Sequence, residues 1–186
     1  YDEPSGHGEL RFTNVRVPRD HVIGELGDGF SIAQGRLGPG RIHHAMRCIG
    51  AAEVALDLMV RRAHARVAFG KPILNLGGNR QKVAEARVAI DQARLLTLFT
   101  AWKLDQVGPL LALTEISAIK LVAPRMLQQI VDDAIQIHGG AGLSRDLPLT
   151  ALFAAARSLR LADGPDEVHQ GMIARREIEK RGLGRA

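Results

Sequence analysis

Cysteine, aromatic residues and long hydrophobic runs are all scarce in this 186-residue chain. The single cysteine, Cys48, cannot form an internal disulfide, and its helical apolar surroundings predict a small core residue in a reducing compartment rather than a nucleophile. No segment approaches the run of about 18 apolar residues that a transmembrane helix needs, so no membrane span is expected. Aromatic residues make up 4% of the chain, and this scarcity favours packed helices over a β-sandwich or barrel.

The charge of the chain is positive but dispersed. A net charge of +5 suggests an anionic partner such as a nucleic acid, a membrane surface or a phosphorylated small molecule. Basic residues alternate with acidic ones except in the tail after Arg175, which argues against nucleic acid. Histidines include the adjacent pair His43 and His44, but no pair spaced four residues apart with a third ligand is present, so we expect no metal site.

The first 25 residues differ in pattern from the rest of the chain. Glu9 to Val17 alternates polar and apolar residues and ends at Pro18, which predicts a β-strand. A glycine-rich stretch at residues 24–29 then predicts a loop. The chain begins with Tyr1 rather than Met, so we expect it to be a piece of a longer protein.

From Phe30 onward the apolar residues recur with a helical period. Long antiparallel helices joined by short loops predict an all-α, up-down helix bundle. Pro39 should kink or break the first helix, Gly108-Pro109 should end the second, and Pro124 should bend the third. The expected helices run from Phe30 to a loop at Phe69–Gly78, then over about Asn79–Val107, Leu111–His138, Leu147–Leu161 and Pro165–Arg181.

Three short motifs follow one another along this helical pattern. Arg66-Val67-Ala68-Phe69-Gly70-Lys71 lies in the first loop, Gln136-Ile137-His138-Gly139-Gly140-Ala141-Gly142 ends the third helix, and Ala162-Asp163-Gly164 precedes the last helix. The second motif, taken alone, is typical of a helix C-cap. The ordered set resembles the C-terminal helical domain of the acyl-CoA dehydrogenase family. The segments Gly38–His44 and Ala162–His169 are most similar to the subgroup typified by human family members ten and eleven.

The resemblance implies a division of the chain into two parts. Residues 1–25 would be a remnant of the family's middle β-domain with its linker, and residues 26–186 the C-terminal helical bundle. The family's N-terminal helical domain and most of its β-domain are not in this sequence, so we expect the chain alone to bind flavin poorly.

The family removes two hydrogens from an acyl-CoA thioester, and the resemblance assigns Asp163 as the catalytic base. A weakly acidic α-proton needs a base in an apolar pocket and a polarised carbonyl, and the neighbours Leu161, Ala162 and Gly164 suit such a pocket. Aspartate replaces the family's glutamate, which shortens the reach of the carboxylate by about 1.5 Å. The local sequence also allows Asp163 to be only the N-cap of the following helix.

The resemblance also assigns residues to the cofactor FAD. Arg66 suits the pyrophosphate and Phe69 the adenosine or ring portion of FAD in a neighbouring subunit. A solvated arginine and a core phenylalanine are the alternative. The expected FAD-binding residues are Arg66, Phe69, Gln136, Gly139, Gly140 and Glu167.

For the substrate, the resemblance places Arg41 at the adenine and phosphate end of CoA and Gly164 beside the acyl group. An arginine behind Gly-Pro-Gly at a helix start is physically suited to phosphate.

The whole protein is therefore expected to be an FAD-dependent acyl-CoA dehydrogenase. Expected partners are acyl-CoA, an electron-transfer flavoprotein as acceptor, and further copies in a homodimer or homotetramer. The expected compartment is the bacterial cytoplasm, or the mitochondrial matrix in a eukaryote. A non-catalytic oligomerisation module and an acyl-CoA oxidase-type flavoenzyme remain as alternatives.

Overall fold

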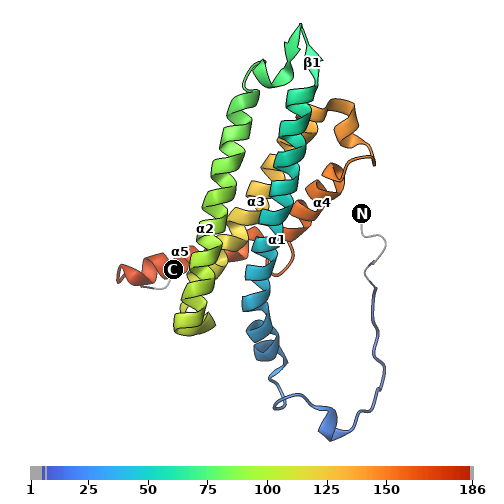
Figure 1. Ribbon diagram of the computed structural model, residues 1–186. Coiled ribbons are helices and arrows are strands. Elements are labelled where there is room, and N and C mark those ends of the chain that lie inside the picture. Colours follow the sequence, from blue (N-terminus) through green and yellow to red (C-terminus); the bar gives the residue numbers. More distant parts are fainter. Residues whose placement is uncertain (1–5, 7, 185–186) are drawn as a thin grey trace.

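The computed structural model describes residue 6 and residues 8–184. Over these residues the chain forms five α-helices joined mostly by short connections (Figure 1), which confirms the prediction of an all-α bundle. The helices are α1 (Gly29–Ala65), α2 (Asn79–Leu111), α3 (Leu113–His138), α4 (Leu149–Leu159) and α5 (Asp166–Lys180). The short elements are β1 (Val67–Ala68), β2 (Lys71–Pro72) and the 3-10 turns η1 (Arg19–His21), η2 (Ile73–Asn75) and η3 (Gly139–Leu143).

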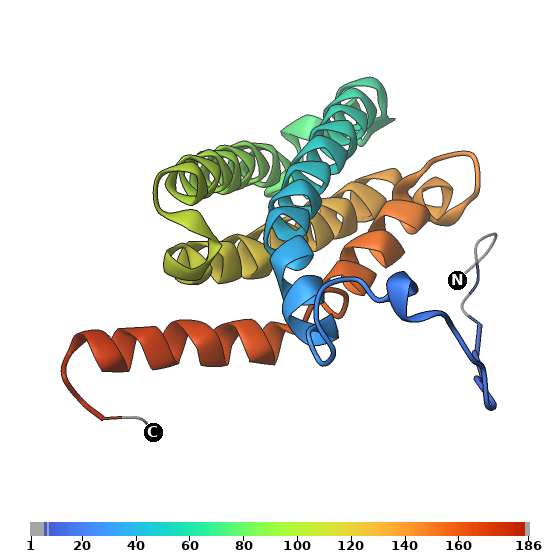
Figure 2. The same ribbon diagram turned by 90° about the horizontal axis from the view of Figure 1, so that it is seen from below.

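Helices α1, α2 and α3 pack against one another around the main core, and α4 lies along α3 (Figure 2). Helix α5 contacts α3 at its start and then extends to the side of the bundle. The buried residues of α1 and α3 recur at spacings of three and four, as one face of a helix requires. They include Ala45, Ile49, Ala52 and Met59 from α1 and Ile119, Ala123, Leu127 and Ile130 from α3.

Helix breakers act differently at two positions. Pro39 lies inside α1, which continues from Gly29 to Ala65, so the expected break is absent. A proline removes one backbone donor, and packing of the later turns of α1 compensates for that loss. In α2 the backbone of Gly108 is non-helical, with φ 77° and ψ 171°, so the regular helix stops there as Gly108-Pro109 predicted.

The strand expected at Glu9–Val17 is not formed. Among the described residues the only strands are β1 and β2, and residues 8–18 run as an exposed arm outside the bundle (Figure 1). Leu10 and Phe12 are both 79% exposed. A strand needs a neighbouring strand for its backbone hydrogen bonds. The alternating pattern at Glu9–Val17 indicates a preference for the β conformation, but it does not provide that partner strand. The division of the chain at residue 25 stays a prediction.

No helix within the described residues combines the length and the apolar character that a bilayer crossing requires.

Candidate functional site

A tight turn between α4 and α5 carries the predicted catalytic residue. Asp163 and Gly164 both have left-handed backbones, with φ of 56° and 103°. Asp163 does not cap α5: Pro165 is the N-cap residue, and no side chain makes a capping hydrogen bond there. The N-cap alternative is therefore wrong. The turn instead directs the Asp163 side chain inward, where it is 16% exposed.

The part of α1 around residues 40–44 supplies the neighbours of Asp163. His44 Nε2 lies 3.2 Å from Asp163 Oδ2, and Arg41 Nε donates a hydrogen bond of 3.1 Å to the Asp163 carbonyl. Gly40 lies beside the same carboxylate, and a Cβ at that position would make an ordinary van der Waals contact of 3.8 Å with Oδ2. The structure thus brings together Arg41, Asp163 and Gly164, three of the residues predicted for substrate binding and catalysis.

Lys120 of α3 holds the same turn from the core side. The residue is 1% exposed, and its Nζ donates hydrogen bonds to the carbonyl of Leu159 and, at 3.4 Å, to the carbonyl of Gly164. Buried amines are rare unless their donors are satisfied. Lys120 therefore ties the end of α4 to the start of the segment that leads into α5.

His169 of α5 completes the surroundings. Its ring is buried, with Nε2 3.3 Å from the Asp163 carbonyl oxygen and Nδ1 3.3 Å from Ser117 Oγ. A Cβ on Gly164 would lie 3.0 Å from His169 Nε2, so the histidine covers the glycine. The imidazole thus occupies the side of Gly164 where a Cβ would project, and the assignment of Gly164 to substrate stays a prediction.

The environment of Asp163 is basic rather than apolar, which corrects the expectation drawn from its sequence neighbours. Leu161, two residues before Asp163, is 58% exposed and so does not enclose the carboxylate in an apolar pocket. Burial lowers the pKa of Lys120, and the Asp163 carboxylate opposes that shift. Burial likewise lowers the pKa of His44, again opposed by Asp163. The carboxylate thus favours the protonated form of both basic neighbours.

A second carboxylate, Asp166, belongs to a structural network. It is 3% exposed and accepts hydrogen bonds from Arg160 Nε at 2.9 Å and Arg125 Nε at 3.1 Å. Burial raises the pKa of Asp166, but the two hydrogen bonds and the positive charges of both arginines together outweigh burial, so this pKa lies below its ordinary value.

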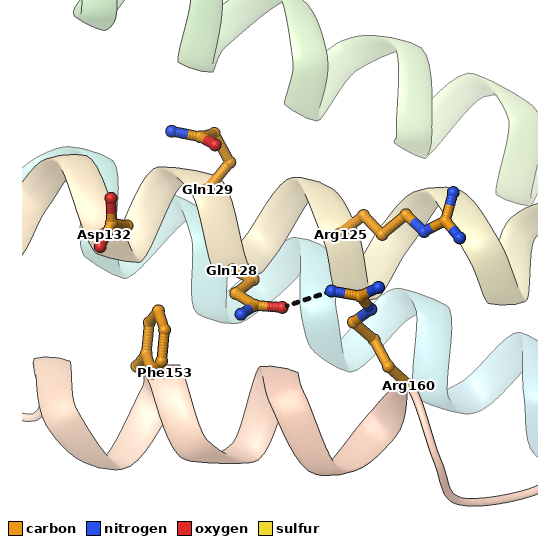
Figure 3. A pocket seen from close by; sticks show the side chains of 6 residues that line it. All are labelled: Arg125, Gln128, Gln129, Asp132, Phe153 and Arg160. Atoms are coloured by element: carbon orange, nitrogen blue, oxygen red, sulfur yellow. Dashed lines mark hydrogen bonds between the residues drawn. The ribbon is translucent and has the colours of Figure 1, made fainter. Parts of the chain in front are cut away.

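The same two arginines border a cavity of about 380 Å³ between α3 and α4 (Figure 3). Arg160 also donates to Gln128 Oε1 at 3.1 Å, and Phe153 faces the opposite part of the cavity. Both guanidinium groups already bind the single Asp166 carboxylate, which offsets only one of their two positive charges. The cavity does not include Asp163.

The loop with Arg66 and Phe69 is a β-hairpin that projects from the end of the bundle (Figure 1). Phe69 sits at the tip with φ 51° and is 93% exposed, so the alternative of a core phenylalanine is wrong. The Arg66 side chain is exposed, and its guanidinium makes no ion pair within the described part of the chain. Both side chains are free to meet another molecule.

The diglycine motif closes α3 at the same end of the bundle (Figure 1). Gly139 has φ 65°, and its N–H caps the helix on the carbonyls of Gln136 and Ile135, as the C-cap reading predicted. Gln136, Gly139 and Gly140 are exposed. These residues and the hairpin lie away from Asp163, so the chain does not join all predicted residues into one site.

The remaining predicted residue and the unpredicted ones lie near α5. Glu167 is exposed in the first turn of α5. His44, Lys120 and His169 were not predicted for the site, although a lysine inside the apolar stripe of α3 was a signal for Lys120. No group of three or more potential metal ligands comes together within residues 8–184.

Comparison with known proteins decides the family. The profile described as "Acyl-CoA dehydrogenase, C-terminal domain" matches residues 27–178.

The chain belongs to the acyl-CoA dehydrogenase family.

It is 52% identical over 178 residues to mouse acyl-CoA dehydrogenase family member 10, covering 96% of this chain and 17% of the relative. It is 51% identical over 173 residues to human family member 11, covering 93% and 22%. The similarity to members ten and eleven is thereby confirmed.

The helical domain of this family also has the same fold in solved structures. A structure from Mycobacterium abscessus, provisionally named an acyl-CoA dehydrogenase, superposes with a TM-score of 0.88 at 62% identity, over 91% of this chain and 42% of that one. This chain of the acyl-CoA dehydrogenase family therefore spans less than half the length of each of these relatives.

Proposed function

We propose that the protein containing this chain is an FAD-dependent acyl-CoA dehydrogenase in which Asp163 is the catalytic base. The observation that carries the proposal is a carboxylate turned inward on a left-handed turn, with a buried Oδ2 that accepts no hydrogen bond from the described residues. A carboxylate that accepts no hydrogen bond is not stabilised by one in its ionised form, so it keeps its capacity to take up a proton. In the reaction Asp163 takes the α-proton of the thioester, and the electrons of that C–H bond form the α,β double bond.

The residues present are suited to FAD, which when bound would accept the β-hydrogen as hydride. The unpaired Arg66 guanidinium would bind the pyrophosphate, and the exposed Phe69 ring would pack on an apolar portion. Gly139 and Gly140 leave the backbone open, because nothing lies within 4 Å of a Cβ at either position. Gln136 would supply an amide. Glu167 lies on α5 and would face the flavin.

Arg41 would bind the phosphate region of CoA. Its Nε is held by the Asp163 carbonyl, which orients the guanidinium and leaves its terminal nitrogens for an anionic ligand. Burial lowers the pKa of Arg41, and the Asp163 charge opposes that shift. The positive group of the substrate site is thus coupled to the turn that carries the base.

The test is Asp163→Asn in the full-length, flavin-loaded protein. Asparagine keeps the shape of the side chain but cannot take the α-proton, so turnover of acyl-CoA should fall by about 10³-fold or more. The 450 nm flavin absorbance per mole of protein should stay unchanged. Asp105→Asn, at an exposed position of α2, is the matched control and should retain normal turnover. Normal turnover of Asp163→Asn would exclude this assignment.

A second candidate function, an assembly module, is favoured by one observation. Helix α2 exposes an apolar stripe, defined as Leu95, Leu98, Phe99 and Trp102, on the side away from the core. Such a contiguous stripe suits a second copy of the chain in a homodimer or homotetramer. Assembly and catalysis are compatible, and only inactivity of the full-length protein would leave assembly as the sole function.

The electron acceptor separates a dehydrogenase from an oxidase. We propose an electron-transfer flavoprotein as the acceptor and the cytoplasm or mitochondrial matrix as the compartment. Hydrogen peroxide formation at the rate of acyl-CoA consumption would instead identify an oxidase.

A further inference from the structure

The contact between His44 and Asp163 joins two partly buried side chains that each have a buried atom without a hydrogen-bond partner among the described residues. His44 Nε2 and Asp163 Oδ2 are 3.2 Å apart, with the side chains 23% and 16% exposed. The distance suits a hydrogen bond, but the alignment does not, and Oδ2 and His44 Nδ1 both lack a hydrogen-bond partner among the described residues. A small rotation of the imidazole would complete the bond.

The charge of the His44 imidazole changes with pH, and this change alters its interaction with the Asp163 carboxylate. A neutral imidazole can donate one hydrogen bond to Oδ2, whereas an imidazolium forms an ion pair with the carboxylate. An ion pair stabilises the ionised carboxylate and so weakens it as a base. The other charged groups facing His44 are Arg47 and His43 from α1 and Lys120 from α3.

Burial lowers the pKa of His44, and the adjacent cations Arg47 and Lys120 act in the same direction, while Asp163 opposes them. The neutral form is therefore the resident form above the ordinary histidine pKa of about 6.5. His169, the other histidine at this turn, contacts the Asp163 carbonyl oxygen rather than the carboxylate, as does Arg41.

We propose that His44 is a positioning residue for Asp163. The neutral imidazole holds Oδ2 and leaves the other carboxylate oxygen free to take the α-proton. When the imidazole becomes protonated, it weakens Asp163 as a base. This inference rests on the proposed function of Asp163. The ring fixes the carboxylate in one orientation, which matters because the aspartate side chain is short and a misplacement of about 1 Å can cost about 100-fold in rate.

The kinetic test uses His44→Ala and His44→Gln in the full-length, flavin-loaded protein, with His43→Gln as the matched control because His43 is the exposed neighbour. His44→Ala should lower kcat by about 10- to 100-fold with KM nearly unchanged. It should also increase the primary isotope effect for an α-deuterated acyl-CoA, because proton abstraction becomes more rate-limiting. His44→Gln should recover part of kcat, since its amide can donate to Oδ2.

The pH profile supplies a signature that a merely structural role would not give. In the wild type kcat/KM should rise with pH as His44 loses its proton. In His44→Gln that rise should move to lower pH, because the amide never becomes charged. Two results together would overturn the proposal: a kcat of His44→Ala equal to that of the wild type, and a rise of kcat/KM in His44→Gln over the same pH range as in the wild type.

A measurement without turnover separates this inference from the proposed function. In protein labelled at the histidine rings, NMR titration should show a downward shift of the His44 pKa in Asp163→Asn, because the attractive charge is removed. An unchanged His44 pKa would show that the pair does not interact and would overturn the inference even if Asp163→Asn is inactive. Normal turnover of Asp163→Asn with a shifted His44 pKa would instead overturn the proposed base.

Discussion

Gly164 shows how one residue fixes the candidate site. Its φ of 103° lies in a region that side chains rarely adopt, and a Cβ there would lie 3.0 Å from His169 Nε2. The residue before it, Asp163, is also left-handed. The turn between α4 and α5 therefore depends on a glycine at position 164, and the direction of the Asp163 side chain depends on that turn.

Gly164→Ala should lower the free energy of unfolding by about 1–3 kcal/mol, because the substitution combines backbone strain with the close contact to His169. Chemical denaturation monitored by circular dichroism measures this change. Gly171→Ala is the control: Gly171 is helical and exposed, with open space around it, so alanine there should stabilise by about 0.5–1 kcal/mol. Equal stability of Gly164→Ala and the wild type would contradict the strain.

At the scale of elements, the placement of the α4–α5 turn depends on α3. Lys120 extends from the buried face of α3 to the carbonyls of Leu159 and Gly164, one at the end of α4 and one just before α5. The Asp166 network with Arg125 links α3 to α5 as well. Helix α3 thus positions both the end of α4 and the start of α5, through the hydrogen bonds of Lys120 and Arg125.

Lys120→Met should destabilise the chain by about 1–3 kcal/mol, because the thioether cannot donate and leaves carbonyls without partners in a buried place. Removal of a buried charge offsets part of this cost, since burial already disfavours the protonated amine. The midpoint of urea unfolding is the measurement. Lys71→Met, at an exposed position of the hairpin, should change stability by less than about 0.5 kcal/mol. A more stable Lys120→Met would show that desolvation outweighs the hydrogen bonds.

At the scale of the whole molecule, the α2 stripe and the two exposed motifs at the hairpin end remain without partners in this chain. The buried side of α2 carries Ala86, Ile90 and Ala93, so the helix is apolar on two faces. A helix that is apolar on both faces is suited to packing on both sides.

Leu98→Lys combined with Trp102→Ser should convert the full-length protein to a smaller assembly, because charge and polarity replace the centre of the stripe. Sedimentation velocity gives the mass. Val54→Lys changes an exposed apolar residue of α1 outside the stripe and should leave the mass unchanged. An unaltered mass for the double variant would show that the stripe is not an interface between copies.

Helical periodicity predicted the five helices, and glycine and proline signals predicted their ends to within a few residues, including the stop at Gly108-Pro109, because each depends on local backbone chemistry. The motif around Gly139 likewise predicted a C-cap correctly, since a left-handed glycine and its capping hydrogen bonds lie within one turn of the chain. The resemblance carried by the motifs, rather than periodicity, gave the family.

The tertiary structure alone decided what surrounds Asp163. His44 and Lys120 lie 119 and 43 residues away along the chain, as their numbers show, and no local pattern relates them to the turn. The same is true of Glu9–Val17, where alternation recorded a strand preference but hydrogen bonds require a neighbour that the fold does not place there. Local structure follows from adjacent residues, whereas the chemical environment of a carboxylate follows from which helix faces meet.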